Sequence, residues 1–397
     1  MGAELMAAAA AAVACAGLGQ AVAGYVTLRR FRAPPVSVAA RPGVTLLKPL
    51  HGDEAMLEDA LASNLMQDYP DYQVVFGVQR PDDPALLVVQ RLRARFPNRD
   101  IAVVCDATLH GRNRKIGNLL NMFPAARHDV IVIADSDVHV APDYLARVVD
   151  ALLVPGTGLV TTLYTGLSAT RTLPGLMGAS AITHGFLPGA LLGRSLGRQD
   201  CLGATMALRR DTLLAVGGLE ALSDHLADDN MLGRLVLARG LRVGLAATVP
   251  ATTVCETTLP ELFRHELRWA RTIRSLVPWQ FALSTVQYPL IWAALAMGLS
   301  NGENWSICLF LLAWAVRAFV ALAVDDELAS SLAPMDAHAS ISLATPAPIW
   351  LLPLRDLMSV SVILASTISD RVEWRGHTLR TDAKVAIERA DAPSGAI

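Results

Sequence analysis

The stretch that decides the fold is DVIVIADSDVHVAP, residues 129–142. Its apolar run Val130–Ala134 predicts a buried strand, and the run ends abruptly in Asp135 and Asp137. Two carboxylates one residue apart repel each other, so they need a cation, a proton or a solvated loop. Such a pair at a strand end suits a hard divalent cation, Mg²⁺ or Mn²⁺. The alternative is a simple capping turn before a helix at 142–153.

Strands and helices alternate upstream of this run. Strands are predicted at 44–50, 72–78 and 101–105, and helices at 54–66, 84–96 and 115–127. Strands alternating with helices of this length predict an α/β fold with a Rossmann-like, mostly parallel sheet covered on both faces. Ligands of such sheets bind outside the carboxyl ends of the strands, which is where Asp135 and Asp137 fall.

Apolar segments flank this α/β region. Hydrophobic residues make up 53% of the 397 residues and charged residues only 18%, an apolar balance for a soluble protein. Residues 5–28 carry no charge and are long enough to span a bilayer. Basic residues follow this segment and none precedes it, which favours an uncleaved anchor with a cytoplasmic domain over a cleaved signal peptide. Further apolar stretches lie at 279–299, 305–324 and 346–366.

The chain is therefore predicted to have four parts. These are an N-terminal transmembrane anchor (1–32), an α/β domain (41–275), a C-terminal membrane region (276–370) and a cytoplasmic tail (371–397). The segments 279–299 and 305–324 are predicted to form a hairpin. Arg317 inside it should face protein or water, because a charge in lipid is costly. The stretch 346–366 contains Arg355 and three prolines and is either re-entrant or interfacial, or a further span.

Charge and cysteine content exclude several classes of protein. The formal net charge is −2 and no strongly basic domain stands out, so a nucleic-acid partner is not expected. The five cysteines have no paired spacing, which predicts free thiols in a reducing compartment. A multi-pass protein of the inner (cytoplasmic) membrane, with its α/β domain facing the cytoplasm, fits these observations.

Two more acidic clusters fall where ligands of an α/β sheet bind. Asp82 and Asp83 follow the strand at 72–78, and Asp228 and Asp229 open a predicted helix. Each cluster alone is explained by helix capping, since the helix dipole favours carboxylates at its start. Three acidic clusters on one rim of the sheet indicate a ligand site.

Two basic segments complete the set. The glycine-containing loop Gly111–Lys115 precedes a predicted helix and suits phosphate binding, although an exposed charged loop is an equal alternative. The segment Phe263–Arg274 places three arginines on one helix face. Because it precedes an apolar stretch, it is alternatively a basic interfacial helix with a tryptophan at the membrane surface.

Taken together, these segments resemble GT-A-fold, family-2-like glycosyltransferases, and most closely the ceramide glucosyltransferase group of family 21. The resemblance covers almost the whole chain, in the order LLKPLHG (46–52), QDYPDYQVVFGVQRPDDPA (67–85), NRKIGNLLN (113–121), IADSDVHVAPD (133–143), CLGATMALRRDTL (201–213), ADDNML (227–232) and HELRW (265–269). Within the group, HELRWARTIR is most similar to the bacterial hopanoid-biosynthesis branch.

The resemblance implies roles for the acidic residues. Asp82 and Asp83 match the family's first acidic motif, which contacts the donor nucleoside. Asp135 matches the leading acid of the second motif, near the sugar diphosphate and the metal, with Asp137 as the partner ligand. Asp229 matches the expected general base, which takes a proton from the acceptor hydroxyl.

Further roles follow for the basic and acceptor-side residues. Arg268 and Trp269 match the closing (Q/R)xxRW motif, which binds diphosphate and shapes the acceptor site, and Lys115 is a further donor-binding candidate. His265 stands where that motif has Gln or Arg, and a neutral imidazole donates a hydrogen bond but carries no fixed charge. The expected acceptor side, which includes the glycine- and leucine-rich segment Thr165–Arg198 without clear periodicity, holds His184, Cys201, Asp228 and His265.

The implied activity is inverting transfer of GlcNAc or glucose from a UDP-sugar to a hydroxyl of a membrane lipid, a hopanoid polyol, with Mg²⁺ or Mn²⁺. A ceramide glucosyltransferase is the first alternative. A processive polysaccharide synthase would normally have more membrane spans. A catalytically silent membrane scaffold is the alternative of a different class, and the presence of Asp135, Asp229 and Arg268 argues against it.

Overall fold

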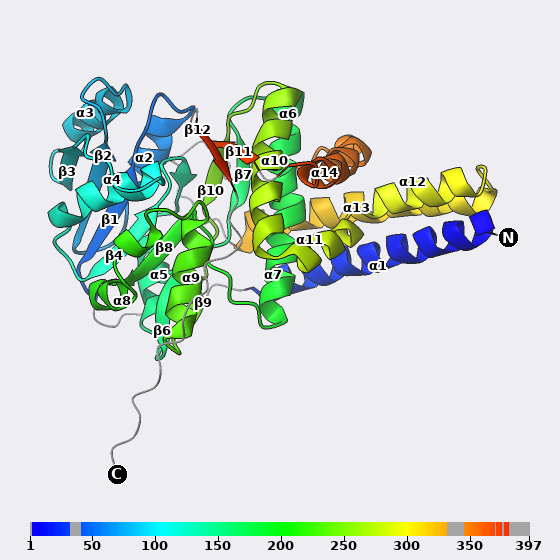
Figure 1. Ribbon diagram of the computed structural model, residues 1–397, viewed down its shortest axis with the longest axis horizontal. Coiled ribbons are helices and arrows are strands. Elements are labelled where there is room, and N and C mark those ends of the chain that lie inside the picture. Colours follow the sequence, from blue (N-terminus) through cyan, green and yellow to red (C-terminus); the bar gives the residue numbers. More distant parts are fainter. Residues whose placement is uncertain (1, 32–40, 332–344, 370, 375–376, 381–397) are drawn as a thin grey trace, which may run out of the picture.

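The computed structural model describes residues 2–31, 41–331, 345–369, 371–374 and 377–380. The α/β domain forms one end of the molecule, and three helices run side by side away from it (Figure 1): α1 (Gly2–Arg30), α12 (Pro289–Leu299) and α13 (Asn304–Ser331). Between these parts lie α6 (Leu173–Ser180), α7 (Leu187–Ser195), α10 (Leu259–Leu276) and α14 (Leu352–Ser366). Residues 32–40, where the predicted anchor meets the predicted α/β domain, lie outside the described residues. So does the predicted tail apart from β11 (Arg371–Trp374) and β12 (His377–Arg380).

The central sheet has seven strands in the order β3-β2-β1-β4-β8-β6-β9. Its first four strands are parallel: β3 (Asp100–Cys105), β2 (Tyr72–Val78), β1 (Val44–Pro49) and β4 (Val130–Ala134). Strand β8 (Thr205–Arg209) runs antiparallel between β4 and β6 (Thr157–Thr161), and β9 (Arg242–Leu245) pairs parallel with β6 at the edge. The predicted strands and the mostly parallel sheet are confirmed.

Alternate side chains of the strands fill two cores, one on each face of the sheet. Leu46, Val74 and Val132 pack with α2 (Leu57–Leu65), α3 (Ala85–Arg95) and α5 (Tyr144–Leu152) on one face. Leu47, Val75 and Ile133 pack with α4 (Arg114–Met122) and α9 (Asp228–Ala238) on the other. The sheet is therefore covered on both faces, as its apolar strands predict.

A second sheet of three strands lies next to the carboxyl end of β4. Its order is β5-β10-β7, with β5 (Val138–His139), β10 (Ala251–Val254) and β7 (Thr165–Ser168). Strand β5 follows the acidic pair directly, and β10 leads into α10. The small sheet thus connects the end of β4 with the helix that carries HELRW.

The segment 165–198, which lacks clear periodicity in the sequence, is largely helical. After β7 it forms α6 and α7, joined without a break by a π-helical segment, Ala181–Phe186. An all-round apolar helix has no 3.6-residue pattern to detect. Pro174 lies in the first turn of α6, where no backbone N–H is needed.

Four described helices are long and apolar enough to cross a membrane: Gly2–Arg30, Leu173–Ser195, Asn304–Ala329 and Ile349–Ser366. A fifth candidate is the pair Pro278–Gln287 and Pro289–Leu299, which is bent by 71°. The apolar stretch 279–299 is bent, because the helix breaks before Pro289, but its second half, α12, packs against α13 as the predicted hairpin requires. These helices fit a membrane protein.

Buried ion pairs connect α13 with α14, and α14 with α10. Arg317 of α13 lies 3.2 Å from Asp356 of α14, which confirms that Arg317 faces protein. The neighbouring Arg355 makes a bidentate pair with Glu266 of α10, at 2.7 and 2.5 Å, and both side chains are largely buried. Arg355 and Asp356, the charged residues of the 346–366 stretch, are thus each paired with an opposite charge inside the protein.

We predict that Glu266→Gln lowers the free energy of unfolding by about 3 kcal/mol, because it leaves the Arg355 guanidinium buried without its counter-charge. Denaturant unfolding of the purified protein measures this loss. The charge-reversed double variant Glu266→Arg with Arg355→Glu should recover part of it. The control is Glu58→Gln, which breaks the exposed pair with Arg91 and should cost less than about 1 kcal/mol. Equal losses of unfolding free energy in Glu266→Gln and Glu58→Gln would show that the buried pair contributes no more to stability than the exposed pair.

Candidate active site

Lys115 joins two of the three acidic clusters. It lies in the first turn of α4, and its Nζ is 2.8 Å from Asp135 Oδ1 and 3.4 Å from Asp228 Oδ2. Burial acts to lower the pKa of Lys115, but the charges of Asp135 and Asp228 more than offset it, so the pKa lies above its ordinary value. A permanent positive charge therefore stands between the end of β4 and the start of α9.

Asp229 presents a carboxylate with altered acidity beside this bridge. Burial, and then the charge of Asp228, raise its pKa to about 6. One carboxylate oxygen accepts from the backbone N–H of Asn230 at 2.7 Å. The other faces Gly203, where an added Cβ would lie 3.2 Å from Oδ2. A carboxylate with this pKa is ionised at neutral pH and basic enough to accept a proton from a reacting hydroxyl.

Asp137 is held more deeply than Asp135. Burial, and then the charge of Asp135, raise the pKa of Asp137 to about 6. The hydroxyl of Thr252, on β10, donates a hydrogen bond to its carboxylate. The two acids of the opening stretch therefore differ: Asp135 is paired with Lys115, and Asp137 is anchored to the small sheet.

A second lysine, which the sequence analysis did not identify, contacts the acidic pair from inside the sheet. Lys48 is fully buried on β1, and its Nζ donates to the main-chain carbonyl of Asp135 at 2.5 Å. Burial lowers its pKa to about 8, and the charges of Asp137 and Asp135 act in the opposite direction. A lysine inside the apolar strand TLLKPL was the available signal, because a buried lysine needs a partner.

The first acidic cluster makes local contacts. Asp83 is buried and accepts from the backbone N–H of Gly52 at 2.9 Å and of Ala85 at 3.0 Å, so it joins the loop after β1 to the start of α3. Asp82 is exposed and pairs with Arg80. Both lie on the rim where β1 and β2 end, but neither contacts the Lys115 bridge.

Helix α10 carries HELRW past the small sheet. Its start is defined by a capping box between Thr258 and Glu261. His265 bonds through Nδ1 to the Glu256 carboxylate and packs edge-on against Trp269, with ring centroids 4.5 Å apart. Trp269 remains 37% exposed, so its indole is available to a ligand. The residue that departs from the family motif, His265, therefore holds the tryptophan in place.

Arg268, next to Trp269 on α10, is partly buried. Its link to the diphosphate stays a prediction.

The residues expected on the acceptor side do not form one cluster. Cys201 is buried beside the acids, and burial followed by the charge of Asp229 raises its pKa well above the ordinary value. His184 lies in the π-helical segment with both ring nitrogens engaged, Nδ1 with Ser180 at 3.1 Å and Nε2 with Asp325 of α13 at 2.8 Å. It therefore joins the π-helical segment to a membrane-side helix.

Tyr164, also missed from the sequence, connects these regions. Burial, and then the charges of Asp229 and Asp135, raise its pKa, which places the phenol close to the acids. Its ring packs against Phe186, with centroids 4.9 Å apart. An aromatic pair thus leads from the acidic rim to the π-helical segment.

The acids fit a metal that is shared with a substrate. Within the described ranges, no group of three His, Cys, Asp or Glu side chains gathers as a ready-made metal site. Asp135 and Asp137 provide two carboxylates, with oxygens left beyond their protein contacts. Mg²⁺ typically binds through one or two carboxylates and the phosphates of a substrate, which matches this donor set.

Known proteins resemble this chain over most of its length. Ceramide glucosyltransferase 1 of Caenorhabditis elegans is 20% identical over 85% of this chain and 72% of its own. The ceramide glucosyltransferase of Komagataella phaffii is 23% identical over 87% of this chain and 84% of its own. The solved structure of the mannosyltransferase PcManGT from Pyrobaculum calidifontis, in complex with GDP-Man and Mn²⁺, is 21% identical, covers 90% of this chain and 99% of its own, and has a TM-score of 0.46.

The match of a family model is the most extensive of these results. The model of glycosyl transferase family 21 matches residues 7–387. The α/β fold, with its mostly parallel sheet and apolar helices at both ends, agrees with the resemblance that the motifs predict. The chain belongs to glycosyl transferase family 21 and is a nucleotide-sugar-dependent glycosyltransferase.

Proposed function

We propose that this enzyme transfers GlcNAc or glucose from a UDP-sugar to a hydroxyl of a membrane lipid, with inversion at the anomeric carbon. The observation that carries the proposal is the position of Asp229, whose raised pKa suits a base and which lies beside the Lys115 bridge. A hopanoid polyol is the first acceptor that we propose, on the resemblance of HELRWARTIR. Ceramide is the second, supported by the names of the relatives.

In the proposed reaction, Asp229 takes the proton from the acceptor hydroxyl while the oxygen of that hydroxyl bonds to the anomeric carbon. The bond from that carbon to the diphosphate oxygen breaks in the same displacement, which gives a β-glycoside and UDP. Lys115 and Arg268 are proposed to stabilise the charge on the leaving diphosphate. Mg²⁺ or Mn²⁺, held by Asp135 and Asp137, would supply further charge neutralisation when bound.

The donor nucleoside is proposed to bind near the end of β2. There the exposed Asp82 carboxylate is accessible to a ligand, while the buried Asp83 holds the surrounding loops. This division of roles refines the family pattern, in which both acids contact the donor.

The acceptor is proposed to arrive from the bilayer along α10 and the π-helical segment. Trp269 is exposed there, and the Tyr164–Phe186 pair extends from the acids toward the apolar helices. We place Cys201 and Asp228 beside the acceptor hydroxyl, and His184 and His265 as residues that hold this side in shape.

The orientation in the membrane follows the distribution of charge. Arg29 and Arg30 end α1 on the side of the α/β domain. Basic residues concentrate on the cytoplasmic side of membrane helices, which supports a catalytic domain that faces the cytoplasm from the inner membrane.

We predict that Asp229→Asn lowers kcat by about 10³-fold, because the amide accepts no proton, while donor affinity stays within about threefold of the original. Product formation and UDP-sugar binding by calorimetry measure the two effects. The matched control is Asp224→Asn, an exposed aspartate of the preceding loop that pairs with Arg112 and should keep full activity. Full activity of Asp229→Asn would refute its role as the base.

The raised pKa of Asp229 predicts the pH dependence of catalysis. A general base must be deprotonated, so kcat/KM should rise with pH, with a midpoint near the Asp229 pKa of about 6, and level off above it. A pH–rate profile between pH 5 and pH 8 tests this, flanking that value by about 1–2 units. The raised pKa of Asp137 lies in the same range, so Asp137→Asn separates the two groups. The residual activity of that variant should still rise with pH around the same midpoint. A profile flat across the range contradicts the assignment.

Donor, acceptor and metal are decided together by one product assay. The purified protein is incubated with UDP-GlcNAc or UDP-glucose and with a hopanoid polyol or ceramide, and products are identified by mass spectrometry. We expect a hexosylated hopanoid, suppressed by EDTA and restored by Mn²⁺ or Mg²⁺. A product with ceramide alone would replace the first acceptor by the second, and an unchanged rate in EDTA would remove the metal from the proposal.

A further inference from the structure

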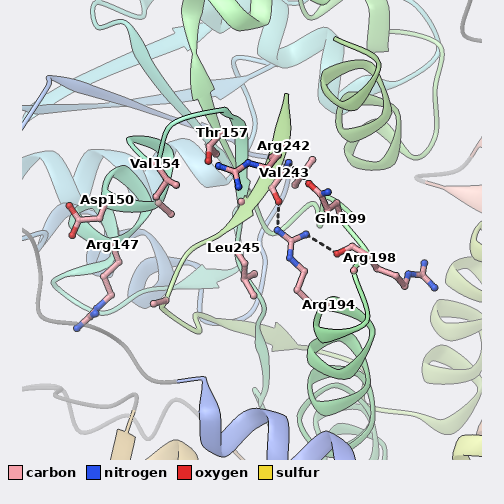
Figure 2. A pocket seen from close by; sticks show the side chains of 14 residues that line it. Arg147, Asp150, Val154, Thr157, Arg194, Arg198, Gln199, Arg242, Val243 and Leu245 are labelled. Atoms are coloured by element: carbon pink, nitrogen blue, oxygen red, sulfur yellow. Dashed lines mark hydrogen bonds between the residues drawn. The ribbon is translucent and has the colours of Figure 1, made fainter. Parts of the chain in front are cut away.

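A cavity of about 510 Å³ lies outside the candidate active site, along the edge strand β9 (Figure 2). The last turn of α5, the end of α7 and the loop that follows α7 form its other walls. Four arginines line it, and we call it the arginine pocket after them: Arg147, Arg194, Arg198 and Arg242. The remaining lining is largely small or apolar, and Asp150 is its single carboxylate.

Two of the four arginines have carboxylate partners inside the protein. Arg147 Nε lies 2.6 Å from Asp143, and Arg198 Nε lies 2.7 Å from Asp200. Asp150 is itself 2.8 Å from Arg41. These charges are therefore compensated by neighbours.

Arg194 and Arg242 are not compensated in this way. Within the part of the chain that the structure describes, their hydrogen bonds go to main-chain carbonyls only. Arg194 donates to the carbonyls of Val243 and Arg198 (Figure 2), and Arg242 donates to the carbonyl of Pro155. Carbonyl acceptors orient a guanidinium but leave its charge in place. Two oriented guanidiniums on one cavity suit an anion with several oxygens, above all a phosphate.

The pocket is separate from the proposed donor site. Thr157 and Arg242, which line it, are the first residues of β6 and β9, whereas Asp135 follows the last residue of β4. Strands β4, β6 and β9 run in the same direction, because β8 is antiparallel to both β4 and β6. The part of the pocket that holds Thr157 and Arg242 thus lies at the amino ends of β6 and β9, whereas Asp135 lies at the carboxyl end of β4.

Its surroundings favour a lipid as the source of the phosphate. Leu245 lines the pocket and also packs against the cluster that contains Leu28 of α1 and Leu191 of α7. The helix α1 ends in Arg29 and Arg30, at the proposed cytoplasmic surface. Phosphates of anionic lipids are concentrated at that surface, which attracts basic groups near membrane helices.

We propose that the arginine pocket binds the phosphate of an anionic membrane lipid through Arg194 and Arg242. Bound lipid would hold the β9 edge of the catalytic domain against the bilayer. This site is additional to the donor and acceptor sites, and it stands whether or not the proposed sugar and acceptor are right.

The test is thermal unfolding of the full-length protein in neutral detergent with short-chain phosphatidylglycerol, phosphatidylcholine or inorganic phosphate at equal concentration. We expect phosphatidylglycerol to raise Tm by about 3 °C or more, and the other two by less than about 1 °C. The gain should disappear in Arg194→Gln/Arg242→Gln, and persist in Arg91→Gln, the matched control, which removes an exposed arginine of α3.

Several outcomes would overturn the proposal. Equal shifts with phosphatidylglycerol and phosphatidylcholine in the unaltered protein show that charge is not recognised. An equal shift with inorganic phosphate assigns the pocket to a free anion instead of a lipid. A full shift in the double glutamine variant places the lipid elsewhere. If that variant does not fold, Arg194→Lys/Arg242→Lys replaces it; because lysine keeps the charge without the bidentate fork, a reduced shift supports the proposal and an undiminished one refutes it.

Discussion

The contact of Lys115 with Asp135 and Asp228 is the interaction on which the active site depends. Acids from the end of β4 and the start of α9 are brought to one rim of the sheet, where their like charges repel. Lys115 lies between them, and Lys48 offsets the same charge from inside the sheet. Burial first, and then the charges of Asp135 and Asp228, still raise the pKa values of Asp137 and Asp229. The residual negative potential is what a cationic ligand at this rim would relieve.

The second constraint is that a soluble donor and a membrane acceptor have to meet at this rim. The pair of Glu266 with Arg355 fixes α10, and with it Trp269, to the helices on the membrane side. His184 does the same for the π-helical segment through Asp325. Buried ionic contacts of this kind add little net stability, but they specify one arrangement of the helices, because any other leaves a buried charge unpaired.

Local patterns allowed much of the architecture to be predicted. Short apolar runs between predicted helices indicate β1 to β4, and the acidic pairs at Asp82, Asp135 and Asp228 indicate the rim at the carboxyl ends of the strands. The α6–α7 helix was not predicted because it is largely apolar all round and shows no helical periodicity. The 71° bend before Pro289 was not predicted because composition indicates how long an apolar segment is and not the direction in which its helices run. Lys48 and Tyr164 were missed because burial and proximity to the acids are properties of the folded chain.

The sequence by itself determined the α/β class, the acidic rim, the apolar flanks and the family, since each rests on residue type and order along the chain. The partners of each charge were decided only by the tertiary structure. Asp135 pairs with a lysine of α4, His265 with Glu256, and Arg194 with main-chain carbonyls. Electrostatic energies depend on distance and burial, and the fold sets both by bringing together residues that are far apart in sequence.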